Sequence, residues 1–247
     1  MTLILETSEK AQVAEQTYSG PPRSKMEIQI RRATETWLRA AYPEARLVHE
    51  LTMGQGRARC DIAAVEPGRL INVEIKSGYD SLERAIHQIG MFHLCGHVTW
   101  FVVAQRWADE AEILRYLFPR VGIAIAVPQG APPEESWRDN PCDYVIETVH
   151  APEPWAPCLE LMVPLLWAAE LQNECNRHRI LPSKYTCGPM AKALMKHLSR
   201  AETEESVCRQ LRSREALWRA DPAVASRTVA SESAAAAPTP DNASSRG

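Results

Sequence analysis

The sequence has no excess of positive charge, no long apolar run and no apparent export signal. Its 28 Lys and Arg residues are outnumbered by 31 Asp and Glu residues, which gives a formal net charge of −3. Any contact with nucleic acid must therefore come from a local patch, because the bulk charge does not favour a polyanion. No stretch approaches the roughly 20 apolar residues of a membrane-spanning helix. The N-terminal MTLILETSEK lacks the charged start and the apolar run of a signal peptide. These absences predict a soluble cytoplasmic protein with no membrane partner.

The cysteines form no recognisable framework. There are seven of them, an odd number, and no two are spaced as Cys-x-x-Cys. This pattern argues against a disulfide scaffold and against a structural zinc site, so we expect reduced thiols.

The composition divides the chain into five segments. A chain of 247 residues predicts one main domain with a smaller appendage. The interpretation in chain order is a flexible N-terminal arm (1–23), a core domain (24–127), a Pro-rich linker with one candidate strand at DYVIETV (128–158), a small helical module (159–221) and a disordered tail rich in Ala, Ser and Pro (222–247).

The core domain alternates between helical and strand-like patterns. We expect, in order, a helix over 24–43, strands over 45–52, 58–65 and 70–77, a helix over 80–94 capped by Asp80, a strand over 98–104, one more helix and a strand over 121–127. The last two strands are almost wholly apolar, as expected of strands covered on both faces. The order α-β-β-β-α-β predicts an α/β fold with a mixed sheet and at least one parallel crossover.

The second and third strands form a hairpin that carries unusual charges. In LINVEIK the apolar residues alternate with Asn72, Glu74 and Lys76, which therefore share one face. A turn centred on Pro67 and Gly68, of type II, sets Asp61 directly opposite Glu74. Such facing carboxylates lie about 5 Å apart at Cβ and repel each other.

Something must relieve that repulsion, either a proton on one carboxyl group or a cation between the two. Oxygen ligands suit a hard divalent ion, Mg²⁺ or Mn²⁺. On this register Lys76 is too far away to neutralise the pair fully but stands beside a metal-bound water. Arg59 lies opposite Lys76, and with Arg57 it forms a basic rim for a phosphate. These groups are the ones that metal-assisted phosphodiester hydrolysis needs. The alternative is a surface hairpin whose outer face is merely polar.

The assembled residues resemble the PD-(D/E)XK nuclease superfamily, whose restriction-endonuclease-like core has the order α-β-β-β-α-β with the acid and the ExK on adjacent strands. The stretch RARCDIAAV…LINVEIKSGYDSLERAIHQIG is similar to a bacterial and phage group of small nucleases of that superfamily, the sce7726 type. The likeness covers about residues 24–127 and extends weakly into the helical block. It departs from the superfamily pattern at Cys60, where the name-giving proline is absent.

The resemblance implies roles for individual residues. Asp61 and Glu74 become metal ligands, Ile75 a ligand through its carbonyl, and Lys76 the residue that orients the attacking water. Gln88, on the following helix, is similar to a glutamine that helps position metal or substrate in RecB-like nucleases, although Phe92 stands where those nucleases have tyrosine.

Two further acids lie near this set. Glu27 matches a helix-borne extra ligand, but Ser24-x-x-Glu27 is also a capping box that needs no catalytic role. Glu50 ends the first strand near the site and is interpreted as a solvated rim residue.

The resemblance implies a magnesium-dependent deoxyribonuclease whose partner is DNA, with RNA and a homodimer as open options. A second hypothesis is a catalytically silent nuclease-fold protein that binds DNA or protein as an accessory of a phage or mobile element. A third places the function in the helical block of residues 159–219 and leaves the sheet as a scaffold.

Overall fold

The computed structural model describes residues 24–78, 80–130, 142–215, 217 and 219–224. The predicted N-terminal arm and nearly all of the predicted tail lie outside the described residues. Within the described part of the chain, no helix is long and apolar enough to cross a membrane. All seven cysteines are free, as expected.

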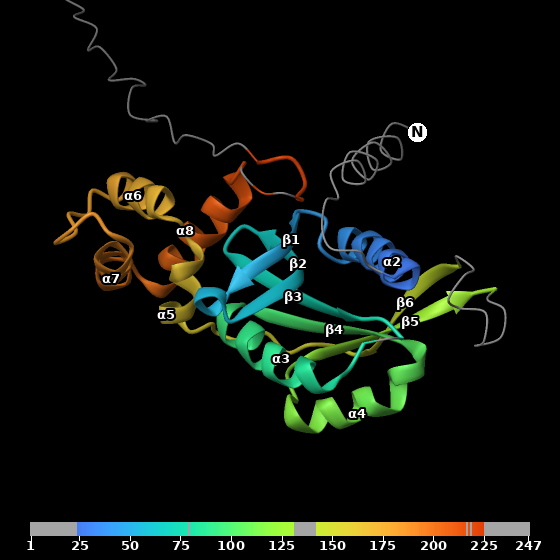
Figure 1. The fold of residues 1–247 in the computed structure, drawn as a ribbon. Helices are drawn as coiled ribbons and strands as arrows, with labels where there is room; N and C mark the ends of the chain where they lie inside the picture. Colours follow the sequence, from blue (N-terminus) through green and yellow to red (C-terminus); the bar gives the residue numbers. More distant parts are fainter. Residues whose placement is uncertain (1–23, 79, 131–141, 216, 218, 225–247) are drawn as a thin grey trace, which may run out of the picture.

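A six-stranded mixed sheet forms the centre of the molecule (Figure 1). Its strands lie side by side in chain order: β1 (Arg46–Met53), β2 (Ala58–Glu66), β3 (Arg69–Lys76), β4 (Val98–Ala104), β5 (Gly122–Gln129) and β6 (Asp143–His150). β4 runs parallel to both β3 and β5, whereas the other neighbours are antiparallel. The predicted α/β class, with a mixed sheet and a parallel crossover, is confirmed.

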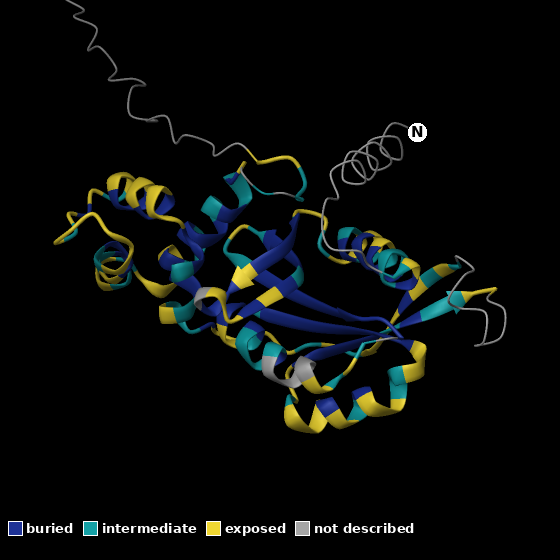
Figure 2. Ribbon diagram, in the orientation of Figure 1, coloured by how far each residue is buried: buried dark blue, intermediate teal, exposed yellow. Residues whose placement is uncertain are grey.

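Helices cover both faces of this sheet. They are α2 (Lys25–Ala41), α3 (Glu83–Cys95), α4 (Ala108–Leu117), α5 (Leu159–Met162), α6 (Ala168–Arg177), α7 (Cys187–His197) and α8 (Arg200–Ser213), with 3₁₀ turns η1 (Gly54–Gly56), η2 (Gln105–Trp107) and η4 (Val163–Leu165). α2 lies on one face and α3 and α4 on the other (Figure 1). β4 is buried at every position (Figure 2), because helices cover the side chains on both faces of this strand.

The helix α2 follows from simple local signals. Ser24 is its N-cap and accepts a hydrogen bond from the Glu27 backbone N–H at 3.1 Å. The helix ends at Ala41, two residues before Pro43, which cannot continue it. Its buried stripe includes Ile30 and Leu38, which pack with residues of β2, β3 and β4 in one hydrophobic cluster.

The predicted hairpin register is confirmed over the paired stretch, which does not extend to Asp61 and Glu74. β2 and β3 pair from Glu66 opposite Arg69 to Ile62 opposite Val73. Gly68 has φ of 67°, the left-handed conformation that a type II turn demands at its third position. The paired stretch stops just before Asp61, so the two strands begin to separate there.

The predicted cap of α3 is wrong. The helix begins at Glu83 rather than residue 80, and its N-cap is Leu82, without a side-chain hydrogen bond. The carboxylate of Asp80 instead accepts hydrogen bonds from the N–H and the hydroxyl of Ser77, each at 2.7 Å. Ser77 follows β3 directly and offers two donors at once, so Asp80 closes the turn after β3.

The segment interpreted as a Pro-rich linker is partly a strand. Residues 143–150 form β6, the edge strand beside β5, at the candidate strand DYVIETV. The following residues are held by backbone bonds to the core: the N–H of Trp155 donates to the His97 carbonyl at 2.8 Å, and the N–H of Cys158 donates to that of Leu94 at 2.8 Å. The linker residues 131–141 lie outside the described residues.

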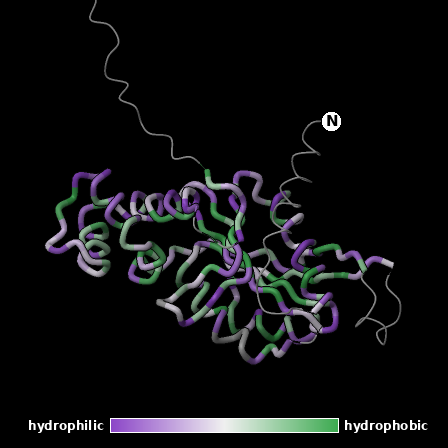
Figure 3. Tube along the Cα trace, turned by 45° about the horizontal axis from the view of Figure 1, so that its top comes forward, coloured by the Kyte–Doolittle hydropathy of each residue, from purple (hydrophilic) through white to green (hydrophobic). Residues whose placement is uncertain are grey.

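The helical block α5–α8 shares a core with the sheet. One hydrophobic cluster joins Val48 of β1, Cys60 of β2 and Phe92 of α3 to Leu165 of η4 and Leu211 of α8. Hydrophobic stretches run through the middle of the trace, while hydrophilic and hydrophobic residues alternate along its outer parts (Figure 3). The block is therefore packed onto the sheet and does not stand apart from it.

After α8 the chain returns to β1. Ala220 forms an isolated bridge with Val48. The Asp221 carboxylate accepts two bonds from Arg39 of α2, at 2.8 and 2.7 Å, and one from the Leu47 N–H at 3.0 Å. This contact ties the end of the described chain to α2 and covers the free edge of β1.

We predict that Asp221→Ala lowers the free energy of unfolding by about 2–3 kcal/mol, because Arg39 and the Leu47 N–H lose a charged acceptor. Urea denaturation measures this. The matched control Asp143→Ala removes an exposed carboxylate and should change stability by less than about 0.5 kcal/mol. Equal effects of the two substitutions would contradict the assigned role.

Candidate active site

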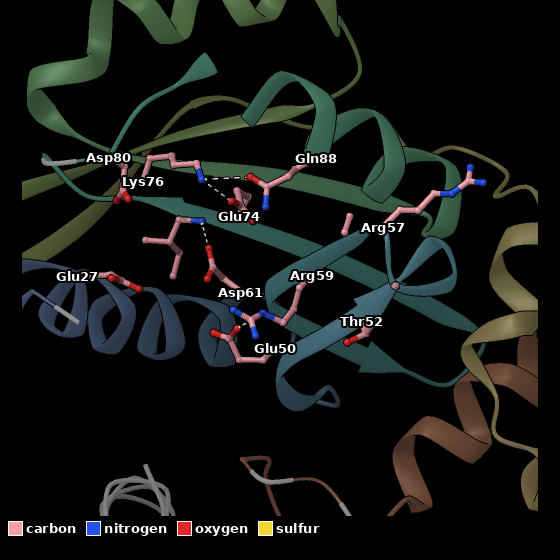
Figure 4. A pocket seen from close by; sticks show the side chains of 13 residues that line it. Glu27, Glu50, Thr52, Arg57, Arg59, Asp61, Glu74, Lys76, Asp80 and Gln88 are labelled. Atoms are coloured by element: carbon pink, nitrogen blue, oxygen red, sulfur yellow. Dashed lines mark hydrogen bonds and ion pairs between the residues drawn. The ribbon is translucent and has the colours of Figure 1, made fainter. Parts of the chain in front are cut away.

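A pocket of about 620 Å³ opens where β2 and β3 separate, between α2 and α3 (Figure 4). Its lining includes all eight residues that the sequence singled out: Glu27, Arg57, Arg59, Asp61, Glu74, Ile75, Lys76 and Gln88. Glu50, Thr52, Gly56, Ala58 and Asp80 complete the lining. The structure thus brings the predicted set together, and their roles in catalysis stay predictions.

Asp61 is held from two sides. Its Oδ2 accepts a hydrogen bond from the Ile75 N–H at 2.8 Å, across the gap where the strands separate. Its Oδ1 accepts one from Nη2 of Arg31 at 2.7 Å, and Nη1 of the same arginine donates to the Asp61 carbonyl at 2.8 Å. Side chain and backbone of Asp61 are therefore both fixed by Arg31.

Glu74 carries the most perturbed carboxyl group of the pocket. Its Oε1 accepts from Lys76 Nζ at 2.6 Å, whereas its Oε2 is buried without a hydrogen-bond partner among the described residues. Burial raises the pKa of Glu74 well above its ordinary value, the nearby Asp61 raises it further, and Lys76 opposes the shift. The repulsion expected between the two carboxylates is therefore present.

Lys76, expected to be too far away to neutralise the pair fully, lies closer to it than the two-residue spacing suggested. Its ammonium contacts Glu74 directly, because a long side chain on the same face spans the two-residue separation. Lys76 Nζ also donates to Gln88 Oε1 at 3.3 Å, so Gln88 of α3 does reach the site. Phe92, one turn further along α3, is fully buried in the core.

Ile75 can offer its carbonyl to the same gap. Its N–H points towards β2 and Asp61. In a strand, the N–H and C=O of one residue point to the same side. The Ile75 carbonyl therefore also faces β2, beyond the last paired residues, Ile62 and Val73.

Arg31 is the residue that sequence reasoning missed. Its side chain is only 2% exposed, and besides Asp61 it contacts Glu50 at 3.3 Å and Glu27 at 3.5 Å. One signal could have found it: Glu27, Arg31 and Glu35 recur at four-residue spacing on one face of α2.

Glu50 is buried, so its interpretation as a solvated rim residue is wrong. The side chain is 5% exposed and forms a 2.7 Å ion pair with Arg59 in addition to its contact with Arg31. Its backbone has φ of 56° inside β1, a conformation that costs a non-glycine residue about 1 kcal/mol or more. Such strain clusters at functional sites, and here it lies beside Asp61.

The basic rim is only partly as predicted. The Arg59 side chain is 58% exposed and paired with Glu50, and its strand partner is Thr52 of β1. It does not pair with Lys76, because the β2–β3 pairing ends at Ile62. Arg57 lies at the far end of the pocket and points away from the carboxylates (Figure 4).

A divalent ion in the gap between β2 and β3 would have carboxylate and backbone oxygens as its ligands. Within the described ranges, no group of three or more His, Cys, Asp or Glu side chains is arranged to hold a metal ion. The oxygens available at the gap are those of Asp61, Glu74 and the Ile75 carbonyl. The buried, unpartnered Oε2 of Glu74 is the atom that a hard cation would satisfy. This donor set fits Mg²⁺ or Mn²⁺ better than zinc.

A buried polar network links the pocket to the C-terminal segment. Arg219 donates to Glu35 at 2.8 Å, Glu35 lies 3.5 Å from His49 Nε2, and His49 Nδ1 lies 3.3 Å from Arg31 Nη1. Burial raises the pKa of Glu35, and Arg219 counteracts the shift. Arg31 is thus positioned by residues far apart in the sequence.

We predict that Arg31→Met lowers the free energy of unfolding by about 3–5 kcal/mol in metal-free buffer, because buried carboxylates lose their cation. Urea denaturation gives the value. Arg32→Met removes the exposed neighbour on the same helix and should cost less than about 0.5 kcal/mol. A stability loss for Arg31→Met as small as that of Arg32→Met would refute the role of Arg31.

A second prediction concerns pH. The raised pKa of Glu35 means that its carboxyl group binds a proton more tightly in the folded state than in the unfolded state. The resulting stabilisation is complete below the ordinary pKa of glutamate and is lost as pH rises through the folded value. Glu35→Gln cannot lose a proton, so its stability relative to wild type should improve as pH rises from about 4.5 towards 8. Denaturation curves that give a constant difference over this range would contradict the assignment.

Comparison with known proteins identifies a family but no activity. The family model described as bacteriophage P4 protein cII matches residues 23–225. No curated protein matches. One similar solved structure is the SPO1766 protein of unknown function from Silicibacter pomeroyi, at 15% identity and a TM-score of 0.38, over 62% of this chain and 92% of that one. Because the family match spans most of the sequence, this chain belongs to the bacteriophage P4 cII protein family.

Proposed function

We propose that this protein is a metal-dependent nuclease that hydrolyses phosphodiester bonds in DNA, with a restriction-endonuclease-like core of the PD-(D/E)XK type. The single observation that carries the proposal is the pair formed by the half-buried Asp61 and the buried Glu74, which share the gap between β2 and β3 while Glu74 Oε2 lacks a partner. The order α2-β1-β2-β3-α3-β4 supports the proposed core.

The chain's own residues suit this chemistry. Asp61, Glu74 and the Ile75 carbonyl would hold Mg²⁺ or Mn²⁺. Such an ion, when bound, lowers the pKa of a water and neutralises charge on the phosphate. In the metal-free protein, Arg31 fixes the orientation of Asp61.

Lys76 and Gln88 complete the proposed mechanism. The Lys76 ammonium lies 2.6 Å from Glu74 and 3.3 Å from Gln88, which places a proton donor beside the carboxylate pair. From this position it can orient the attacking water or stabilise the leaving oxygen. Arg59, which is largely exposed at the pocket, can contact a phosphate if it exchanges Glu50 for substrate.

A second candidate is a catalytically silent accessory protein with the same core. One observation favours it: Arg31 neutralises Asp61, and Lys76 neutralises Glu74, without any metal ion. The nuclease proposal requires that an ion compete successfully with these internal cations. The two candidates therefore differ in whether the pocket binds a divalent ion.

We predict that the wild-type protein cuts plasmid or short single-stranded DNA only with Mg²⁺ or Mn²⁺, and that Asp61→Asn and Lys76→Ala each lower the rate at least about 100-fold. The control Asp143→Asn, at an exposed position on β6, should cut like wild type.

Thermal unfolding provides a readout independent of cutting. Mn²⁺ should raise the melting temperature of the wild type and of Asp143→Asn but not that of Asp61→Asn, because only a pocket with both carboxylates gains from the ion. Full cutting by Asp61→Asn would refute the site. Absence of both cutting and stabilisation in the wild type would favour the silent accessory protein.

A further inference from the structure

The charges of the helical block are segregated along the chain. Between Glu174 and Glu202 there is no Asp or Glu, yet this stretch contains six Lys or Arg residues. The numbers of acidic and basic residues in the block as a whole are nearly equal, but its acids lie before and after this stretch. The connection between α6 and α7, together with α7 itself, is therefore locally basic in a chain of net charge −3.

Five of these cations are exposed and make no side-chain hydrogen bond or ion pair with any residue that the structure describes: Arg177, Arg179, Lys184, Lys192 and Lys196. We call them the α6–α7 basic surface. They occupy the last turn of α6, the connection and the exposed side of α7, at the end of the molecule remote from α4 (Figures 1 and 2).

Exposed arginines elsewhere in the described chain commonly have acidic partners. Arg69 lies 3.6 Å from Glu66, for example, and Arg115 lies 3.6 Å from Glu112. The α6–α7 basic surface differs because none of its cations pairs with an acid that the structure describes; Glu174, three residues before Arg177, pairs with Arg209 instead. Its cations retain their full charge for an external anion.

Helix dipoles explain only part of this surface. Arg177 and Lys196 lie in the last turns of α6 and α7, where a cation is favoured in any case. Lys184 lies in the connection and Lys192 in the middle of α7, so the dipole does not account for them. Tyr185, beside Lys184, is 55% exposed. An exposed aromatic ring next to cations suits a sugar or a base.

The basic surface is connected to the pocket through packed elements. η1, next to Arg57 at the pocket's end, packs against η4 and α5, and α7 also packs against η4. Two intervening elements, η4 and α5, therefore join α7 to the Arg57 end of the pocket. Lysine and arginine side chains without a base-reading element favour contact with a phosphate backbone rather than with particular bases.

We propose that the α6–α7 basic surface binds the sugar-phosphate backbone of DNA outside the pocket. Its role as a substrate-holding surface rests on the proposed nuclease function, whereas DNA binding itself does not. Each lysine that contacts a phosphate releases counterions, so its contribution must appear in the salt dependence of binding.

The test uses the full chain in EDTA, which separates binding from cutting, with a short fluorescent DNA duplex as probe. Lys192→Gln combined with Lys196→Gln should weaken binding at least about tenfold at low salt and reduce the slope of log K against log salt by about two. The control combines Arg32→Gln with Arg115→Gln, which removes equal charge from exposed positions on α2 and α4. This control should retain most of the wild-type affinity and slope. Melting temperatures establish that each variant is folded.

Four results would overturn the proposal, and the last of them leaves the nuclease function standing. One is equal loss in the two double variants, which would mean that only bulk charge matters. Another is wild-type protein that does not bind the duplex at low salt. The third uses polyglutamate as a second probe: if the lysine double variant loses binding to polyglutamate but not to DNA, the partner of the surface is an acidic protein. If the wild-type protein cuts DNA and the lysine double variant binds DNA as tightly as the wild type, the proposed surface is rejected and the nuclease function is not. Lysine-dependent binding without cutting would reject the nuclease alone.

Discussion

The placement of two carboxylates, the half-buried Asp61 and the buried Glu74, at the open end of a β-hairpin is the constraint on which the rest of the site depends. Pairing between β2 and β3 ends at Ile62 and Val73, and the carboxylate of Asp61 then takes the N–H of Ile75 that a ladder partner would otherwise accept. Glu74 is 2% exposed beside it. Two acids this close cannot both be charged without cations nearby, and the chain supplies Arg31 and Lys76.

Those cations are held in place by distant parts of the fold. Arg31 lies on α2, which is anchored to the C-terminal segment through Arg39 and Asp221. The polar chain Arg219–Glu35–His49 ends on Arg31 itself. The helical block contributes in a different way, since it shares one hydrophobic core with β1, β2 and α3. Pocket, α2 and helical block thus behave as one packed unit, in which damage to the C-terminal contacts should reach the site.

Much of this arrangement could be predicted from local patterns. The alternation in LINVEIK and the Pro67–Gly68 turn determine the hairpin register, because a slip by one residue would exchange the apolar and polar side chains between the two faces of the sheet. The spacing of Glu27, Arg31 and Glu35 marks Arg31, but its burial could not be predicted in this way. A charged residue on an amphipathic helix normally faces solvent, and its burial depends on acids from β1 and β2. The contact of Lys76 with Glu74, the strained backbone of Glu50 and the turn closed by Asp80 likewise depend on side-chain reach and strand separation, which spacing does not encode.

The charge segregation in the helical block shows the opposite case, in which the sequence contained a signal that average composition concealed. Counting charges over the whole block gives near balance and hides the acid-free stretch between Glu174 and Glu202. The structure adds that the cations of this stretch are exposed. A pocket with buried acids and a separate basic surface would divide chemistry and substrate binding between two parts of one packed unit.

The most direct measurement of the central claim is anomalous diffraction from crystals soaked in Mn²⁺. The account predicts a manganese ion at the gap between β2 and β3, bound by Asp61, Glu74 Oε2 and the Ile75 carbonyl. A fully soaked crystal with no anomalous peak there, and with the Arg31–Asp61 and Lys76–Glu74 pairs intact, would contradict it.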